Sequence, residues 1–216
     1  MKITSRFTLA WLMLAVGLLQ KTVADEVLDW NAILRTAIVT AALPGPLTFR
    51  GPAIVQSSVF DAVNGIDQRY TPIHVTDKAP PGASRRAAAV EAAYTALVSL
   101  FPAQSATFDQ AHTNSLAAIA ADSTETSALI ASGQAWGKQV ANEILAWRQT
   151  DGFDPSPSTY QGSQLTGKWR PTPPANANGL APSLATTLPW VIPSPSAFRP
   201  AGPPDLTSAQ YAADLN

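Results

Sequence analysis

The sequence predicts an all-α protein: a bundle of about five helices over residues 25–150, a proline-rich extended segment over 151–205, and the start of a further helix over 206–216. Three observations predict this arrangement. Alanine, a strong helix former, is abundant up to residue 150. Apolar residues recur there three or four positions apart, as on one face of a helix. Twelve of the 19 prolines then fall between residues 151 and 205, and proline is excluded from helix interiors.

The first two predicted helices are separated by a turn rich in proline and glycine. The first covers residues 27–41 and ends at residues 43–46. The second runs from near Pro52 to Ile66, and a polar loop that contains proline follows over residues 67–81. The apolar stripes are Val27, Trp30, Leu34, Ala37 and Ala41 in the first helix and Val55, Val59, Ala62, Val63 and Ile66 in the second.

Three further helices are predicted before residue 151. The third begins near residues 82–84 and is broken by Pro102, and the fourth covers residues 103–121. The fifth has Asp122 as its expected N-cap, with Glu125 at the capping-box position three residues later. The stripes of these helices are Val90, Tyr94, Leu97, Val98 and Phe101; then Phe108, Leu116 and Ile119; then Leu129, Gly133, Trp136, Val140, Ile144 and Trp147.

The proline-rich segment contains more bulky apolar side chains than a disordered linker usually does. They are Trp169, Leu184, Leu188, Trp190, Val191, Ile192 and Phe198. We therefore predict an extended segment that lies on a protein surface, part of which belongs to a region outside this sequence. The last helix is expected to begin with Thr207 as N-cap and Gln210 at the capping-box position. Because so short a helix is marginal by itself, we expect the chain to be a truncated part of a longer protein; a natural frayed tail is the alternative.

Residues 1–24 have the pattern of a secretory signal peptide. Lys2 and Arg6 precede an apolar run of 13 residues over 7–19, and Thr22-Val23-Ala24 offers a cleavage site. The run is too short to cross a membrane as a helix. We therefore expect export to the periplasm or the extracellular space and no stable membrane span after cleavage. A retained membrane anchor is the alternative.

The composition of the remaining 192 residues limits the function classes. Removal of Lys2, Arg6 and Lys21 from the 14 basic residues leaves 11 against 15 acidic residues, a net charge of −4. No basic stripe is present, so nucleic acid is not an expected partner. Cysteine is absent, which excludes disulfides, thiolate metal ligands and cysteine nucleophiles.

No residue is assigned to a catalytic, cofactor-binding or metal-binding site. His74 and His112 show neither a His-Glu-x-x-His pattern nor a second histidine at helical spacing, so both are expected to be packing or surface residues. Neither a Gly-x-Ser-x-Gly motif nor a phosphate-binding glycine loop occurs. Six further charged residues are expected to serve in turns, caps, ion pairs or solvation: Asp61, Asp67, Asp151, Asp154, Arg35 and Arg50. The alternative for the two arginines is to hold a phosphate-like anion.

Seven short stretches follow one another in a specific order along the chain. They are Val27–Asn31, Phe60–Ile66, Ala79–Ser84, Leu100–Gln104, Trp169–Pro174, Phe198–Pro200 and Leu206–Tyr211. Taken together they resemble the N-terminal half of the bacterial vanadium-dependent haloperoxidase-like proteins, in the superfamily of type-2 phosphatidic acid phosphatases. The resemblance implies a complete enzyme that binds vanadate and oxidises halide with hydrogen peroxide, or an acid phosphatase that binds phosphate on the same scaffold.

The resemblance also implies that the chemistry lies outside this chain. The family holds its oxyanion with Lys, six residues, Arg-Pro; with Pro-Ser-Gly-His; and with Ser-Arg, five residues, His, three residues, Asp. Cationic side chains neutralise the oxyanion, and a histidine coordinates vanadium or attacks phosphorus. All three parts are missing: Arg170-Pro171 and Arg199-Pro200 lack the lysine, because Ser163 and Ile192 stand at its position. Vanadate, or phosphate as substrate, is thus expected only in the complete protein, with a missing C-terminal helical half as partner.

The sequence leaves three functions open. In the first, the chain is the N-terminal helical part of an exported vanadium-dependent haloperoxidase-like enzyme and is itself inactive. In the second, the complete protein is an acid phosphatase of the same superfamily. In the third, the chain is complete and is an exported helical binding or scaffold protein without catalysis. Under the first two functions, a second helical bundle covers an apolar face of this chain. The chain alone should therefore associate with itself, for example as a homo-oligomer.

Overall fold

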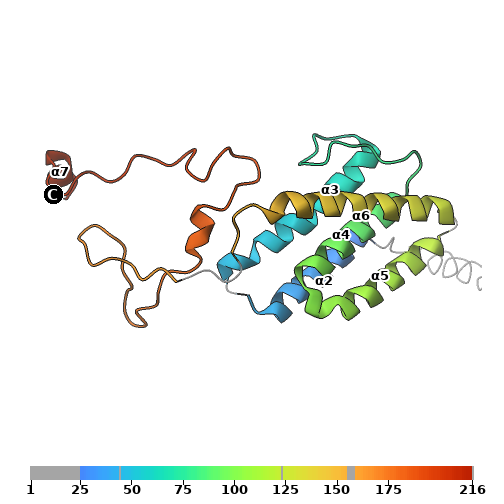
Figure 1. Cartoon of the computed structure of the whole chain (residues 1–216), viewed down its shortest axis with the longest axis horizontal. Coiled ribbons are helices and arrows are strands. Elements are labelled where there is room, and N and C mark those ends of the chain that lie inside the picture. Colours follow the sequence, from blue (N-terminus) through green and yellow to red (C-terminus); the bar gives the residue numbers. More distant parts are fainter. Residues whose placement is uncertain (1–24, 44, 123, 155–158, 216) are drawn as a thin grey trace, which may run out of the picture.

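A computed structural model describes residues 25–43, 45–122, 124–154 and 159–215. Within these ranges the chain forms six α-helices and no strand, so the predicted all-α class is confirmed. Five of the helices pack into one bundle (Figure 1): α2 (Glu26–Ala41), α3 (Arg50–Asp67), α4 (Arg85–Leu100), α5 (Ser105–Ala120) and α6 (Ser127–Gln149). The helix α4 contacts all four others and is therefore the centre of the bundle. The predicted signal peptide lies outside the described residues, and no helix among the described ones is long and apolar enough to cross a membrane.

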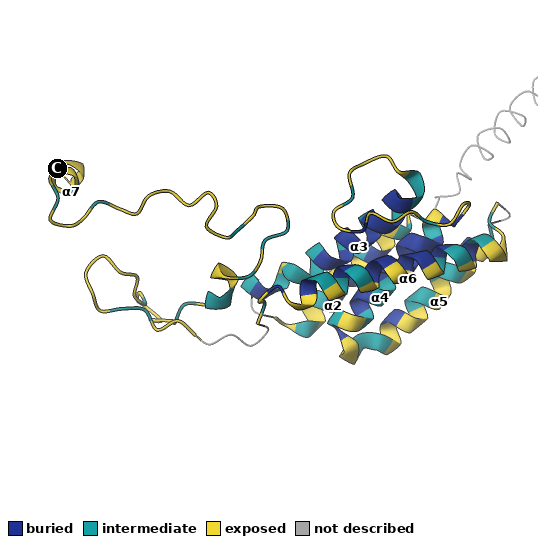
Figure 2. Ribbon diagram, turned by 45° about the horizontal axis from the view of Figure 1, so that its top comes forward, coloured by how far each residue is buried: buried dark blue, intermediate teal, exposed yellow. Residues whose placement is uncertain are grey.

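The core of the bundle consists largely of the predicted apolar stripes (Figure 2). Most of the stripe positions are buried, whereas others, such as Val27 and Tyr94, remain partly exposed. The most extensive contact joins α4 and α6, and it depends on two glycines. A Cβ atom at Gly133 would overlap the carbonyl oxygen of Ser84, and one at Gly137 would overlap that of Ala88. The two helix backbones can therefore approach closely only because these positions lack a side chain.

Two predicted helix starts are wrong, and both fail for the same reason. The helix α6 is capped by Thr126, whose hydroxyl accepts from the Leu129 N–H, and not by Asp122. The Asp122 carboxylate accepts instead from the N–H and hydroxyl of Thr124 and binds Arg86. An acidic side chain that closes its own turn is not free to cap the helix that follows.

The same competition shifts the start of α7 (Ala209–Leu215). The predicted N-cap, Thr207, donates its N–H and hydroxyl to Asp205. The Ser208 hydroxyl accepts from the Tyr211 N–H at 3.1 Å and caps the helix instead. Gln210 donates to Asp214 and does not reach back to the cap.

The long loop between α3 and α4 is held by a buried carboxylate. Asp61, in α3, is fully buried and accepts the N–H groups of Ile73, His74 and Val75 at 2.8–2.9 Å. Asp61 therefore caps the backbone N–H groups of the loop, which is one of the structural roles expected from the sequence. Three N–H donors replace the water that a carboxylate loses on burial.

Residues 159–208, here called the arm, extend away from one end of the bundle to α7, which lies apart from the other helices (Figures 1 and 2). The arm contains one antiparallel bridge, between Tyr160 and Gly179, and a short 3₁₀ turn over Pro182–Ala185. Most of its residues are exposed. The large apolar ones among them are Tyr160, Leu165, Trp169, Leu180, Leu184, Leu188, Val191, Ile192, Phe198 and Leu206. The described structure thus shows the extended, apolar segment that the sequence predicts.

Candidate functional site at the root of the arm

The arm meets the bundle at a cluster of buried charges, here called the anchor: Arg50, Arg148 and Asp151, with Trp147 and Trp190. Arg148 lies in the last turn of α6, and Arg50 is the first residue of α3. Arg148 and Asp151 are each only 2% exposed. Ion pairs join the Asp151 carboxylate to Arg50 Nε at 2.9 Å and to Arg148 Nη2 at 2.9 Å.

Arg148 links this ion pair to the arm. Its guanidinium donates to the carbonyl oxygens of Leu188 at 2.6 Å and Pro189 at 3.3 Å. The same group packs against two indole rings, 4.9 Å from the ring centre of Trp147 and 4.4 Å from that of Trp190, and these rings contact each other edge to face. In addition, the Leu188 N–H donates to the Asp151 carbonyl oxygen at 2.7 Å. The anchor therefore fixes residues 188–190 of the arm against the end of α6.

The electrostatics of the anchor favour an ionised Asp151. Burial by itself raises the pKa of this carboxyl group, but the hydrogen bond from Arg50, the Phe153 N–H and the charges of Arg50 and Arg148 outweigh it, so the pKa lies below its usual value. Arg50 also donates to the Arg148 carbonyl oxygen at 2.5 Å and lies 4.8 Å from the Phe153 ring centre. Protein oxygens accept from several donors of both guanidinium groups, which therefore tie the end of α6 to α3 and to the arm.

A groove of about 690 Å³, here called the end groove, lies beside the anchor at the same end of the bundle. Apolar side chains form much of its wall, among them Leu43, Leu47, Leu100, Phe101 and Phe153. Two of its long polar side chains are engaged: Arg50 binds Asp151, and the Gln104 amide donates to the Ala37 carbonyl oxygen at 3.0 Å. The wall of the end groove is therefore mainly apolar, with Gln149 as a further polar side chain.

Of the candidate residues named from the sequence, the structure brings Arg50 and Asp151 together in the anchor. His74, His112 and Arg35 do not take part in this ion pair. His74 stacks on Trp147, with ring centres 4.3 Å apart. His112, on α5, binds Glu91 through Nε2 at 2.7 Å and stacks on Tyr94. Arg35 is exposed on α2.

The described residues do not fit a vanadate site. No group of three or more histidine, aspartate or glutamate side chains among them could hold a metal ion. Arg170 and Arg199, the two arginines followed by proline, are both exposed on the arm. The described residues that line the end groove do not combine lysine, arginine, serine and histidine side chains, so no step of oxidation or phosphoryl transfer is assigned to this part of the chain.

The bundle and arm have the fold of one part of a vanadium-dependent peroxidase. A similar solved structure is the crystal structure of a bacterial vanadium-dependent iodoperoxidase, with a TM-score of 0.67 and 20% sequence identity. The match covers 87% of this chain and 48% of that chain, so this chain spans about half the length of the solved structure. No protein-family model matches the sequence, and no curated protein matches it. The predicted resemblance is thereby confirmed at the level of the fold.

Proposed function

We propose that this chain is the N-terminal helical part of an exported vanadium-dependent haloperoxidase-like enzyme. The structural match carries the proposal, because 87% of the chain follows about half of an iodoperoxidase fold. The seven ordered stretches of sequence support the same family. In the complete protein, vanadate and the oxidation of halide by peroxide belong to the other half. This chain supplies the frame and is inactive alone.

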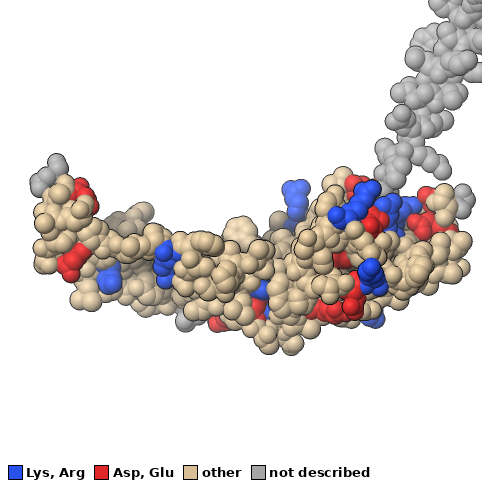
Figure 3. Space-filling view, turned by 90° about the horizontal axis from the view of Figure 1, so that it is seen from above, with Lys and Arg blue, Asp and Glu red and all other residues tan. Residues whose placement is uncertain are grey.

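The partner in this proposal is a second helical half, which covers the arm and the end groove. Large exposed apolar side chains recur along the arm, and the face of the arm seen in Figure 3 carries few charged side chains. Apolar surfaces of this extent mark interaction sites more often than free surface. The anchor supports this role, since it fixes the middle of the arm on the bundle while both flanking stretches remain exposed.

The test of the enzymatic proposal is the gene beyond the codon for Asn216. An open frame that encodes Lys-x₆-Arg-Pro, Ser-Gly-His and Ser-Arg-x₅-His in this order supports it. The longer product is then assayed with vanadate, hydrogen peroxide and iodide, and separately with a phosphate monoester. Halide oxidation that requires vanadate is the expected result, whereas phosphate release without it would assign an acid phosphatase. A stop codon directly after Asn216 would overturn the proposal and favour a scaffold protein.

The partner proposal has a separate test on the chain alone. Sedimentation velocity and binding of a hydrophobic dye should show self-association and an accessible apolar surface. Self-association should weaken when Trp169 and Phe198, both exposed on the arm, are replaced by serine. A monomer that binds no dye would contradict the proposed docking surface, whereas the structural match to the iodoperoxidase would still stand.

A further inference from the structure

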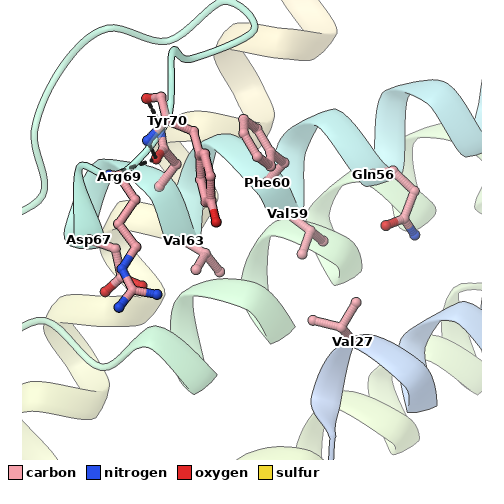
Figure 4. A pocket seen from close by; sticks show the side chains of 9 residues that line it. Val27, Gln56, Val59, Phe60, Val63, Asp67, Arg69 and Tyr70 are labelled. Carbon is pink, nitrogen blue, oxygen red and sulfur yellow. Dashed lines mark hydrogen bonds between the residues drawn. The ribbon is translucent and has the colours of Figure 1, made fainter.

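A second groove, here called the side groove, lies between α2 and the C-terminal half of α3 (Figure 4). Its volume is about 290 Å³, near the lower limit of small-molecule sites. Valine and aromatic side chains form its floor and one wall, with Arg69 at its edge: Val27, Val59, Phe60, Val63, Arg69 and Tyr70 (Figure 4). The end groove adjoins the opposite ends of both helices, so the side groove is a separate feature.

The rim of the side groove is fixed by one buried amide. Asn64 Oδ1 accepts the N–H groups of Arg69 at 3.2 Å and Tyr70 at 2.9 Å, and Nδ2 donates to the Tyr70 carbonyl oxygen at 2.8 Å. Gln68 turns the chain in the left-handed region, with φ of 50°. The Tyr70 ring also packs against Phe60, with ring centres 6.2 Å apart. Arg69 and Tyr70 are therefore held over the apolar floor by contacts that do not involve their polar ends.

The charge at this rim is not balanced. Asp67 also lines the groove, but its carboxylate forms an ion pair with Arg85 at 3.1 Å. Among the described residues, the Arg69 guanidinium has no acidic partner within ion-pair distance. One positive charge therefore stands beside a valine-lined floor, which is complementary to a molecule with an apolar body and a single negative group.

We propose that the side groove binds a small apolar monoanion, such as a medium-chain carboxylate. The carboxylate binds Arg69, and the aliphatic part lies on Val59 and Val63. The end groove does not offer this combination, because its arginine, Arg50, is already paired with Asp151. The inference stands on the described residues alone and does not depend on the proposed haloperoxidase function.

The test uses octanoate as the probe and octanamide as its uncharged counterpart, with the full chain labelled at its valine methyl groups. We expect octanoate to shift the NMR signals of Val27, Val59 and Val63 in a saturable manner. Arg69→Gln should weaken octanoate binding at least tenfold and leave octanamide binding unchanged. Val63→Phe, which fills the groove, should weaken both. Arg35→Gln removes an exposed arginine from α2 outside the groove and should change neither.

Three results would overturn the inference. In the first, octanoate causes no saturable shift in the millimolar range. In the second, Arg69→Gln binds octanoate as the unmodified chain does. In the third, the shifts occur at the end groove and spare Val59 and Val63. Because Arg69 is exposed, its replacement is not expected to affect folding, and an unchanged urea unfolding curve verifies this.

Discussion

The anchor makes a quantitative prediction about Arg148. We consider Arg148→Met, which keeps an unbranched apolar stem beside Trp147 and Trp190 but removes the guanidinium. The variant loses the pair with Asp151 and the hydrogen bonds to the carbonyl oxygens of Leu188 and Pro189. The loss should destabilise the protein and release the arm from the bundle.

The size of this destabilisation depends on which hydrogen bonds and ion pairs the partners of Arg148 retain in the variant. Removing one partner of a buried ion pair costs about 3–5 kcal/mol when the remaining charge is left unpaired. Here Asp151 keeps Arg50 at 2.9 Å and the Phe153 N–H at 2.9 Å, so the cost should fall at or below the lower end of this range. The carbonyl groups of the arm lie near the surface, where water can replace the lost donor. We therefore expect a loss of about 2–3 kcal/mol in the free energy of unfolding.

Urea denaturation followed by circular dichroism measures this loss, and limited proteolysis measures release of the arm. Arg35→Met is the matched control, because Arg35 is exposed on α2 and its replacement should change stability by less than about 0.5 kcal/mol. Proteolysis near residues 188–190 should accelerate in Arg148→Met and not in the control. A variant within 0.5 kcal/mol of the unmodified chain, with unchanged proteolysis, would refute the assignment of Arg148 as the link between arm and bundle.

Three further predictions concern the bundle and the anchor. Gly137→Ala should destabilise the protein by about 1–3 kcal/mol, because its Cβ atom overlaps the Ala88 carbonyl oxygen. Gly51→Ala, whose Cβ atom meets only the Phe101 ring at 3.6 Å, should be neutral or stabilise the protein by up to about 1 kcal/mol. Thermal unfolding of the two variants measures both effects. Asp61→Ala should accelerate hydrogen exchange of the three loop N–H groups that its carboxylate accepts, and unchanged exchange would contradict its role. Because the pKa of Asp151 is lowered in the folded state, its contribution is present above the unfolded pKa of about 3.9 and is lost as pH falls through the folded value. The acid side of the stability curve should therefore be shallower in Asp151→Asn, and parallel curves would contradict it.

The bundle could be predicted from the sequence because burial repeats with the period of the helix. The stripe from Gly133 to Ile144 is buried as predicted, since apolar spacing is a property of one continuous segment. Helix starts are less predictable, because neighbouring side chains compete for the same N–H groups. Asp122 is a good N-cap residue by type, yet Thr124 and Arg86 engage it before α6 can.

The anchor could not be predicted as a site, because its members meet only in the folded chain. Arg50 and Asp151 are 101 residues apart in sequence, and the acceptors on the arm are backbone carbonyl groups, which have no residue signature. The sequence did contain one indication of the anchor. Arg148 follows Ile144 by four positions and so falls on the buried stripe of α6. A charged residue on such a stripe requires a buried partner, although the sequence does not say which.

The anchor holds only a short part of the arm, which supports the proposal that the rest of the arm packs against a second protein surface. Ordering each residue of an extended segment costs about 1–2 kcal/mol in backbone entropy, and the anchor secures only residues 188–190 directly. The stretches on either side have few hydrogen bonds of their own and expose side chains such as Trp169 and Phe198. Contacts within the described chain therefore do not offset the cost of holding the whole arm in one conformation. Burial of its apolar side chains against the proposed second half would supply the missing stabilisation, with the anchor setting the point from which the arm extends in both directions.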